Sequence, residues 1–278
     1  MKLSCAVFDM DGTLLTPDNK ISETDLKTLH RLSDDGVKIV IATGRCELQI
    51  KEYIAMLNIA DPIITCNGSV IMNPATREVI SEKFIKPSIA EGMLSAFDKD
   101  GTDYLIYTSD YVYYTHSSAR VNFIMEYNET APEEYRVPLR PSSEYPKELR
   151  YENIIKILVI DNLKRMPELN GRFNNEGDLT LVTSGLDPVS GRELIDIMPA
   201  NCSKGSAIKI LADYLGIPIS EVAAFGDSPN DEDMLRAAGF SVAMGNAVES
   251  IKQVADFVTL RNDENGITYA LEHITKKL

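Results

Sequence analysis

Three clusters of polar residues each follow an apolar stretch of the chain. They are Asp9-Met10-Asp11-Gly12-Thr13, Thr43-Gly44-Arg45, and Gly226-Asp227-Ser228-Pro229-Asn230-Asp231. The apolar stretches are typical of buried strands in a parallel sheet. In such a sheet, ligands bind beyond the carboxyl ends of the strands. We therefore expect the three clusters to converge on one site.

The carboxylates in these clusters indicate a metal site. Asp9 and Asp11 stand two residues apart after the first strand, and Asp227 follows a later one. Carboxylates held close together repel one another, and a divalent cation relieves that repulsion. Hard oxygen ligands in small number suit Mg²⁺, which favours a phosphate as co-ligand. The alternative is that each Asp is a solvated turn residue or a helix cap. The occurrence of all three clusters after apolar stretches favours the metal site.

Both ends of the chain alternate strand and helix patterns, which indicates parallel βαβ units. In the N-terminal part we predict strands at 3–8, 37–42 and 63–65, with helices from the capping box at 22–25 to Gly36 and around 47–57. After Pro199 the pattern returns. We predict helices at 203–215, 230–238 and 247–255, and strands at 222–225 and 240–244.

The middle of the chain has a different pattern. A helix at 88–99 precedes a predicted hairpin of strands 104–107 and 111–115, and a similar helix–strand–strand succession includes strands near 179–183 and 194–198. The Pro-rich stretch 132–146 is predicted to be irregular. The expected fold class is α/β: a Rossmann-like parallel-sheet core with an inserted α+β domain. The expected boundaries are 1–83 for the first core segment, 84–190 for the insertion and 191–278 for the second core segment.

Composition excludes several classes of partner. The 278 residues carry 28 basic and 42 acidic side chains, a net charge of −14, with an isoelectric point near 4.7. Without a basic patch, this charge argues against nucleic acid and anionic membranes as partners. No apolar run approaches the ~18 residues of a membrane-spanning helix, and the apolar start is short for a signal peptide. Four scattered cysteines are typical of reduced thiols, so a cytoplasmic location is expected.

The order of the motifs resembles that of the haloacid-dehalogenase-like phosphatases. The four motifs are Asp9-x-Asp11-Gly12-Thr13, Thr43-Gly44-Arg45, Lys204-Gly205 and Gly226-Asp227-x-x-Asn230-Asp231. The insertion between the second and third motifs resembles the C2B-type cap of the Cof-type branch, subclass IIB. Further matches are Asn67-Gly68, Val242 to Ala247 and Asp263 to Gly266. The resemblance implies the fold of that family and a Mg²⁺-dependent phosphatase.

The resemblance also implies roles for the two aspartates of the first motif. Asp9 would be the nucleophile that forms an aspartyl-phosphate, which divides one difficult displacement into two easier steps. Asp11 would be the general acid for the leaving group and then the base for the hydrolytic water. The carboxylates of Asp9 and Asp227 and the main-chain carbonyl of Asp11 would hold Mg²⁺.

The remaining motif residues would bind phosphate or support the site. The implied phosphate ligands are Thr43, Gly44, Lys204 and Asn230. The implied supporting residues are Gly12, Arg45, Asn67 and Asp231, of which Asp231 would orient Lys204 or a metal-bound water. Thr43 also suits a helix N-cap. A cation at a helix start is disfavoured by the helix dipole, which favours a functional role for Lys204. Arg45 either binds substrate or pairs with a carboxylate.

These residues are compatible with three functions. The first is hydrolysis of a small phosphorylated metabolite, such as a sugar phosphate or a similar phosphomonoester. The second is a phosphomutase of sugar phosphates, and the third is a non-enzymatic regulatory protein that carries phospho-Asp. The acid at Asp11 favours hydrolysis of an alcohol-derived ester, which steady release of phosphate would distinguish from the other two. The substrate depends on the insertion and stays open, as does the oligomeric state.

Overall fold

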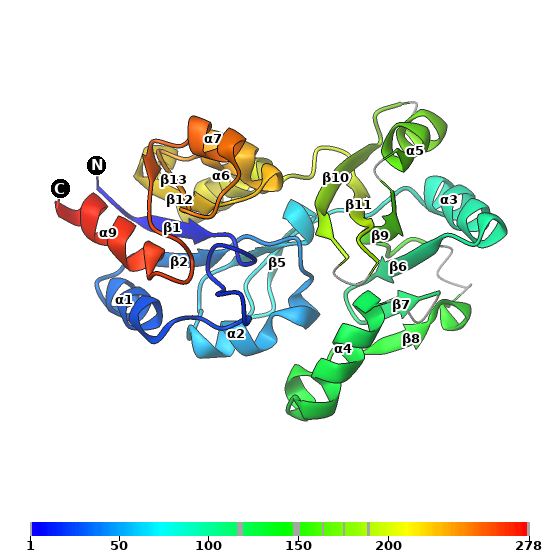
Figure 1. The fold of residues 1–278 in the computed structure, drawn as a ribbon, viewed down its shortest axis with the longest axis horizontal. Coiled ribbons are helices and arrows are strands. Elements are labelled where there is room, and N and C mark those ends of the chain that lie inside the picture. Colours follow the sequence, from blue (N-terminus) through cyan, green and yellow to red (C-terminus); the bar gives the residue numbers. More distant parts are fainter. Residues whose placement is uncertain are drawn as a thin grey trace. The chain divides into compact units, whose positions relative to one another are not determined.

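The computed structural model describes residues 2–115, 119–146, 151–162, 164–174, 176–187 and 190–276. Within these residues the chain forms two compact units. The first comprises residues 1–44, 53–81 and 203–278, and the second comprises residues 45–52 and 82–202. Both chain termini belong to the first unit (Figure 1). None of the described helices is both long and apolar enough to cross a membrane.

The first unit is built on a parallel sheet in the order β14-β13-β12-β1-β2. Its strands are β1 (Cys5–Phe8), β2 (Lys38–Ile41), β12 (Val222–Gly226), β13 (Phe240–Ala243) and β14 (Phe257–Val258). A second, three-stranded sheet contains β3 (Ile63–Thr65), β4 (Val70–Met72) and β5 (Val79–Glu82). Ala42, just after β2, pairs with Ile64 of β3, so β3 continues the parallel arrangement. The predicted α/β core is confirmed.

Helices cover both faces of the parallel sheet. Helices α6 (Lys204–Leu215) and α7 (Glu232–Ala237) lie on one face, and α1 (Glu23–Asp34) and α9 (Gly266–Lys276) lie on the other (Figure 1). The unit also contains α8 (Glu249–Val254). Strand residues with no polar side chain, such as Val7 and Ala224, pack against Ile208 and Leu211 of α6. Since both faces are covered, these strands are mostly apolar, as the sequence pattern indicates.

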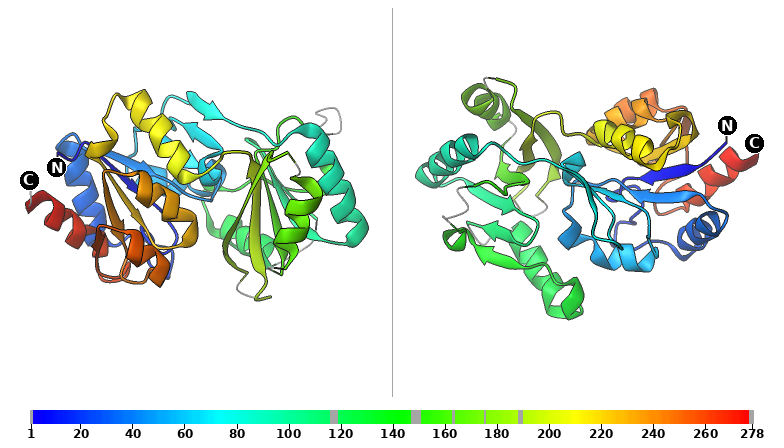
Figure 2. Two further views of the ribbon diagram at one scale, coloured as in Figure 1. Left: turned by 90° about the horizontal axis from the view of Figure 1, so that it is seen from above. Right: turned by 180° about the vertical axis from the view of Figure 1, so that it is seen from behind.

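The second unit contains a six-stranded sheet in the order β10-β11-β9-β6-β7-β8. Its strands are β6 (Asp103–Tyr107), β7 (Val112–Tyr114), β8 (Leu139–Pro141), β9 (Lys156–Asp161), β10 (Leu179–Leu186) and β11 (Glu193–Pro199). Neighbouring strands are antiparallel except β7 and β8. Helices α3 (Pro87–Asp100) and α5 (Arg165–Phe173) pack on one face of this sheet (Figure 2), and α4 (Ala119–Thr130) completes the unit.

Some predicted elements differ from the observed ones. The helix predicted around 47–57 is a 3₁₀ turn at Glu47–Gln49 followed by a short α2 (Lys51–Met56), because Ile50 leaves the helical region at φ −127°. Within the stretch 132–146, predicted to be irregular, Leu139–Pro141 joins the sheet as an edge strand, where proline is tolerated. The central strand β9 and helix α4 were not predicted.

The predicted end of the insertion at residue 190 also differs from the observed packing. That boundary assigns Glu193–Pro199 to the core, but this strand pairs with both β10 and β9 in the sheet of the second unit. Residues 45–52 pack with the second unit as well, although they follow the second motif in the chain. The boundary between the two units therefore depends on strand pairing and packing. The change in local composition along the chain does not indicate these contacts.

Candidate active site

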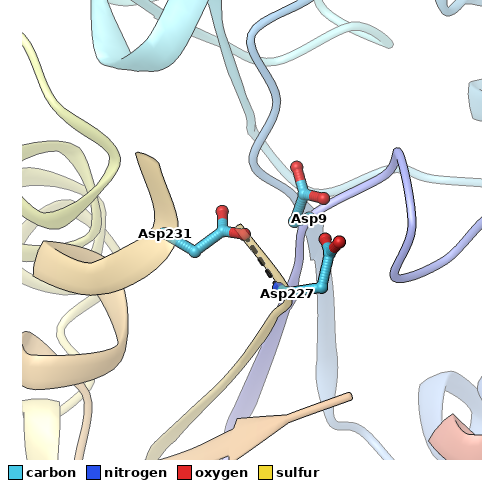
Figure 3. A group of neighbouring side chains, drawn as sticks. All are labelled: Asp9, Asp227 and Asp231. Atoms are coloured by element: carbon cyan, nitrogen blue, oxygen red, sulfur yellow. Dashed lines mark hydrogen bonds between the residues drawn. The ribbon is translucent and has the colours of Figure 1, made fainter. Parts of the chain in front are cut away.

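Strands β1 and β12 bring the first and fourth motifs together. Phe8 and Phe225 are partners in the parallel ladder, and their rings stack with centroids 4.6 Å apart. The backbone N–H of Asp9, the next residue, donates to the carbonyl of Phe225 at 3.0 Å. Asp227 comes two residues after Phe225. Because the register is fixed by apolar strand residues, the two carboxylates emerge side by side, as predicted (Figure 3).

Lys204 enters this site from the first turn of α6. Ser203 caps the helix by accepting a hydrogen bond from the N–H of Ser206. A Cβ on Gly68, where φ is +92°, would lie 2.3 Å from the carbonyl oxygen of Ser203, so only glycine allows the helix start to come this close. The Nζ of Lys204 lies 2.6 Å from Oδ1 of Asp9 and 2.6 Å from Oδ1 of Asp231.

Asp231 holds both Lys204 and its own turn. It ends the 3₁₀ turn at Pro229–Asp231, and its Oδ2 accepts hydrogen bonds from the N–H groups of Asp227 and Ser228, each at 3.0 Å. A Cβ on Gly226 would lie 2.5 Å from the Cβ of Asp231, so glycine is needed there. The contact with Lys204 corresponds to one of the two roles implied for Asp231, and the other role stays a prediction.

Three carboxylates form a cluster that could hold a metal ion. Single oxygen atoms of Asp9, Asp227 and Asp231 lie within 4.8 Å of one another (Figure 3). Both oxygens of Asp231 already accept hydrogen bonds from Lys204 or from the backbone. Oxygen atoms of Asp9 and Asp227 are therefore the better ligands. With Lys204, the ionised cluster carries three negative charges and one positive charge, a net −2 that a divalent cation would neutralise.

Burial and mutual repulsion change the protonation of this cluster. Burial, followed by the charge of Asp231, raises the pKa of Asp9 well above its ordinary value. The same two causes raise the pKa of Asp227 to about 7. Burial alone would lower the pKa of Lys204, but the carboxylates of Asp231 and Asp9 outweigh it and raise that pKa. Such perturbed groups gathered at strand ends are typical of functional sites.

The loop after β1 shapes the position of Asp227. The hydroxyl of Thr13 donates to Oδ1 of Asp227 at 3.1 Å. Gly12 has φ +82°, and a Cβ there would lie 2.4 Å from Oδ2 of Asp227. The supporting role predicted for Gly12 thus has a steric basis. Asp11 is exposed, and its backbone pairs with that of Leu15; its side chain is not part of the three-carboxylate cluster.

The second motif lies beside Asn67 and Asn230. The N–H of Asn67 donates to the carbonyl of Thr43 at 2.9 Å, and Asn230 Nδ2 donates to Asn67 Oδ1 at 3.2 Å. Gly44 leaves room for this amide, since a Cβ there would lie 3.1 Å from Asn67 Oδ1. Asn67 and Cys66 both have positive φ, near 50°, which is uncommon for residues other than glycine and more frequent for asparagine than for cysteine.

The structure thus brings most of the predicted residues to one edge of the first unit. Arg45 belongs with residues 45–52 to the second unit, and its role stays a prediction. Thr13, Asn246 and Asn262 also form hydrogen bonds in this region, and no role was predicted for them. The family-like segment Val242 to Ala247 contains Gly245-Asn246, and glycine followed by asparagine is typical of a tight turn. This pattern could have indicated a structural role for Asn246.

Comparison with known proteins shows the family of this chain. The family of haloacid dehalogenase-like hydrolases matches residues 6–271. The chain belongs to this family. It is an enzyme that hydrolyses phosphate esters, of the Cof type within subclass IIB.

Two curated relatives and one solved structure illustrate the family. Phosphatase YwpJ of Bacillus subtilis is 32% identical, over 96% of this chain and 98% of the relative. The 5-amino-6-(5-phospho-D-ribitylamino)uracil phosphatase YwtE of the same organism is 28% identical, over 98% of each chain. The structure of the subclass IIB sugar phosphatase BT4131 superposes with a TM-score of 0.82 at 25% identity, over 98% of this chain and 99% of that one.

Proposed function

We propose that this enzyme is a Mg²⁺-dependent phosphatase of a small phosphorylated metabolite and that it acts through an aspartyl-phosphate. The observation that supports this most directly is the buried Asp9 carboxylate, whose Oδ1 lies 2.6 Å from Lys204 while Asp227 lies alongside. A lone buried carboxylate would be costly and inert. Here the adjacent ammonium keeps the carboxylate oriented and supplies positive charge where phosphoryl oxygens would lie.

In the first step, an oxygen of Asp9 attacks phosphorus. A bond forms between Asp9 and phosphorus, the ester P–O bond breaks, and the leaving oxygen takes a proton from Asp11. In the second step, Asp11 accepts a proton from a water molecule as that water attacks phosphorus. The Asp9–phosphorus bond then breaks, inorganic phosphate leaves, and both aspartates return to their starting state.

The metal would be held by Asp9 and Asp227, with the Asp11 carbonyl as a further ligand. When bound, Mg²⁺ supplies positive charge that offsets the repulsion between the carboxylates and the phosphoryl group. The net −2 of the buried cluster supports a divalent ion rather than a monovalent one. Thr13, which bonds Asp227, keeps that ligand in place.

The phosphoryl oxygens would be bound by groups at the ends of several strands. These are the hydroxyl of Thr43, the backbone at Gly44, the amide of Asn230 and the ammonium of Lys204. Asn67, through its bond to Asn230, supports this set. Since Thr43 is buried and its backbone is tied to Ile64 and Asn67, its hydroxyl would be offered from a rigid position.

The second unit is proposed to act as the cap domain that selects the substrate. The names of the relatives, a phosphatase of a phosphoribityl compound and a sugar phosphatase, support a sugar phosphate or a similar phosphomonoester. Arg45, which belongs to this unit, is proposed either to bind the substrate or to pair with a carboxylate. A cytoplasmic location is part of the same proposal, supported by four buried thiols.

The test is phosphate release from a panel of phosphorylated metabolites with and without Mg²⁺. Wild-type enzyme should release phosphate steadily only with the metal, and Asp9→Asn should release none and form no phosphoenzyme in rapid-quench mass spectrometry. Asp25→Asn makes the same change at another buried carboxylate, one that bonds Thr268 away from the site, and should retain turnover. Turnover by Asp9→Asn would contradict the proposal. Transfer of phosphate to a sugar acceptor without net release would indicate a mutase instead.

A further inference from the structure

The loop that carries Asp11 is held by side chains from a distant part of the chain. Asp11 lies between β1 and α1, and its backbone pairs with that of Leu15. Asn246 Nδ2 donates to the carbonyl of Gly12, the residue after Asp11, at 2.7 Å. Asn262 Nδ2 donates to the carbonyl of Leu15 at 2.7 Å. On the C-terminal side of Asp11, the carbonyls of Gly12 and Leu15 therefore each accept a hydrogen bond from an asparagine amide.

The two asparagines also act on each other. The backbone N–H of Asn262 donates to Oδ1 of Asn246 at 3.0 Å, so the amide of Asn246 is bonded at both ends. Asn262 is buried, with 6% of its surface exposed. An amide that both donates and accepts has its rotation fixed, which neither serine nor aspartate would reproduce with the same partners. Together the two neutral amides restrain the backbone of the loop at Gly12 and Leu15 without adding a charge near the site.

The loop that contains Asn246 contacts the fourth motif as well. The N–H of Met244 donates to the carbonyl of Gly226 at 3.0 Å, and the N–H of Val248 donates to the carbonyl of Asp227 at 3.1 Å. The segment 244–248 is thus bonded to the loop of Asp11 and to the loop of Asp227. It fixes the spacing of the two loops on which the proposed chemistry depends.

We propose that Asn246 and Asn262 are positioning residues that hold Asp11 at the distance needed for proton transfer. The inference rests on the proposed function, in which Asp11 is the general acid. Proton transfer requires heavy atoms about 2.6–3.2 Å apart. Asp11 is exposed and lies on a loop that follows β1, so its position depends on how firmly the backbone after it, at Gly12 and Leu15, is held. The two amides supply that restraint.

The test compares two substrates that differ in their need for an acid. An alkyl phosphate needs its leaving oxygen protonated, whereas p-nitrophenyl phosphate releases a stable phenolate. The ratio kcat/KM reports the formation of the phosphoenzyme, the step in which the acid acts. Asn246→Ala should lose roughly 10²-fold in kcat/KM for the alkyl phosphate and much less for p-nitrophenyl phosphate. Asn262→Ala, which leaves Asn246 in place, should show the same selectivity and serves if the first variant does not fold.

A matched control and a double variant complete the design. Asn73 Nδ2 donates to the carbonyl of Ala60 at 2.9 Å, far along the chain from Asp11, so Asn73→Asp removes a comparable bond and should change neither substrate. Asp11→Asn should show the selective loss directly. In Asp11→Asn combined with Asn246→Ala, the alkyl phosphate should lose no more than with Asp11→Asn alone, because both changes act through one acid.

The outcomes separate this inference from the proposed function. If Asp11→Asn loses the alkyl phosphate selectively but Asn246→Ala and Asn262→Ala lose both substrates equally or neither, the positioning role is wrong and the acid role of Asp11 stands. If Asp11→Asn itself loses both substrates equally, the acid role is wrong, and the inference built on it is overturned too. Additive losses in the double variant would also overturn it.

Discussion

Lys204 and Asp231 form an ion pair at 2.6 Å in which both side chains are completely buried. The two residues are 27 positions apart, one in the first turn of α6 and the other at the end of a 3₁₀ turn after β12. Asp231 also accepts two backbone hydrogen bonds, which orient its carboxylate independently of Lys204. The contact with Asp231 thereby keeps the Lys204 ammonium next to Asp9.

Removal of Lys204 should therefore destabilise the protein as well as inactivate it. Lys204→Met leaves the carboxylates of Asp9 and Asp231 buried without a cation, which typically costs about 3–5 kcal/mol. Chemical denaturation without Mg²⁺ would measure this loss. Lys209→Met, on the exposed side of the same helix, should stay within about 0.5 kcal/mol of wild type. Equal stability of Lys204→Met and Lys209→Met would show that the pair contributes little.

Binding of Mg²⁺ should strengthen as pH rises toward and through about 7, the pKa of Asp227. Below that pH the carboxyl holds a proton that the metal must displace, so affinity should fall by about tenfold per pH unit. The folded-state pKa lies above the ordinary 3.8, so the metal-free protein should lose stability as pH rises from about 4 to 7. The thermal shift caused by Mg²⁺ should accordingly grow over this range. Isothermal titration at several pH values checks the first expectation, and an affinity independent of pH would contradict it.

Gly12→Ala should reduce activity through Asp227. The new methyl group would meet the Asp227 carboxylate at 2.4 Å, and φ +82° is unfavourable for alanine. Gly36→Ala is the matched control, because its φ is +88° but nothing lies within 4 Å of the added Cβ. Both variants should lose about 1 kcal/mol of stability from backbone strain. Only Gly12→Ala should weaken Mg²⁺ binding; an equal effect in both variants would assign the loss to strain alone.

The second unit contains a buried ion pair, Lys156 and Asp196. Replacing one member should destabilise the protein more than replacing both. Lys156 Nζ lies 2.9 Å from Asp196 Oδ1 and 4.5 Å from the ring centroid of Tyr107, with 4% and 1% of the two charged residues exposed. Lys156→Met should cost about 3–5 kcal/mol, because it leaves a buried carboxylate. The double variant Lys156→Met with Asp196→Leu should recover most of that loss. Thermal unfolding of the three proteins provides the measurement, and a double variant as unstable as the single one would contradict this expectation.

Local pattern was sufficient to predict four of the five strands of the parallel sheet, and the two-residue strand β14 was not predicted. The stretches around Val7, Val40 and Ala224 are apolar without interruption, and only a strand covered on both faces needs that composition. Polar residues directly after such strands then had to lie at one edge, so the proximity of Asp9 and Asp227 was predictable. Strand β9 was missed because Lys156 and Asp161 bracket its apolar core and no turn signal separates it from its surroundings.

The sequence by itself thus determined four strands of the parallel sheet and the polar residues that follow them, because side-chain burial and turn chemistry act on neighbouring residues. Only the tertiary structure decided that Asp231 joins the carboxylate cluster, that Arg45 packs with the second unit, and that Asn246 bonds the carbonyl of Gly12 across 234 positions of the chain. Such contacts depend on how helices and loops pack after the sheet has formed. They form between groups that are far apart in the sequence, so they produce no periodic pattern of apolar and polar residues from which they could be predicted.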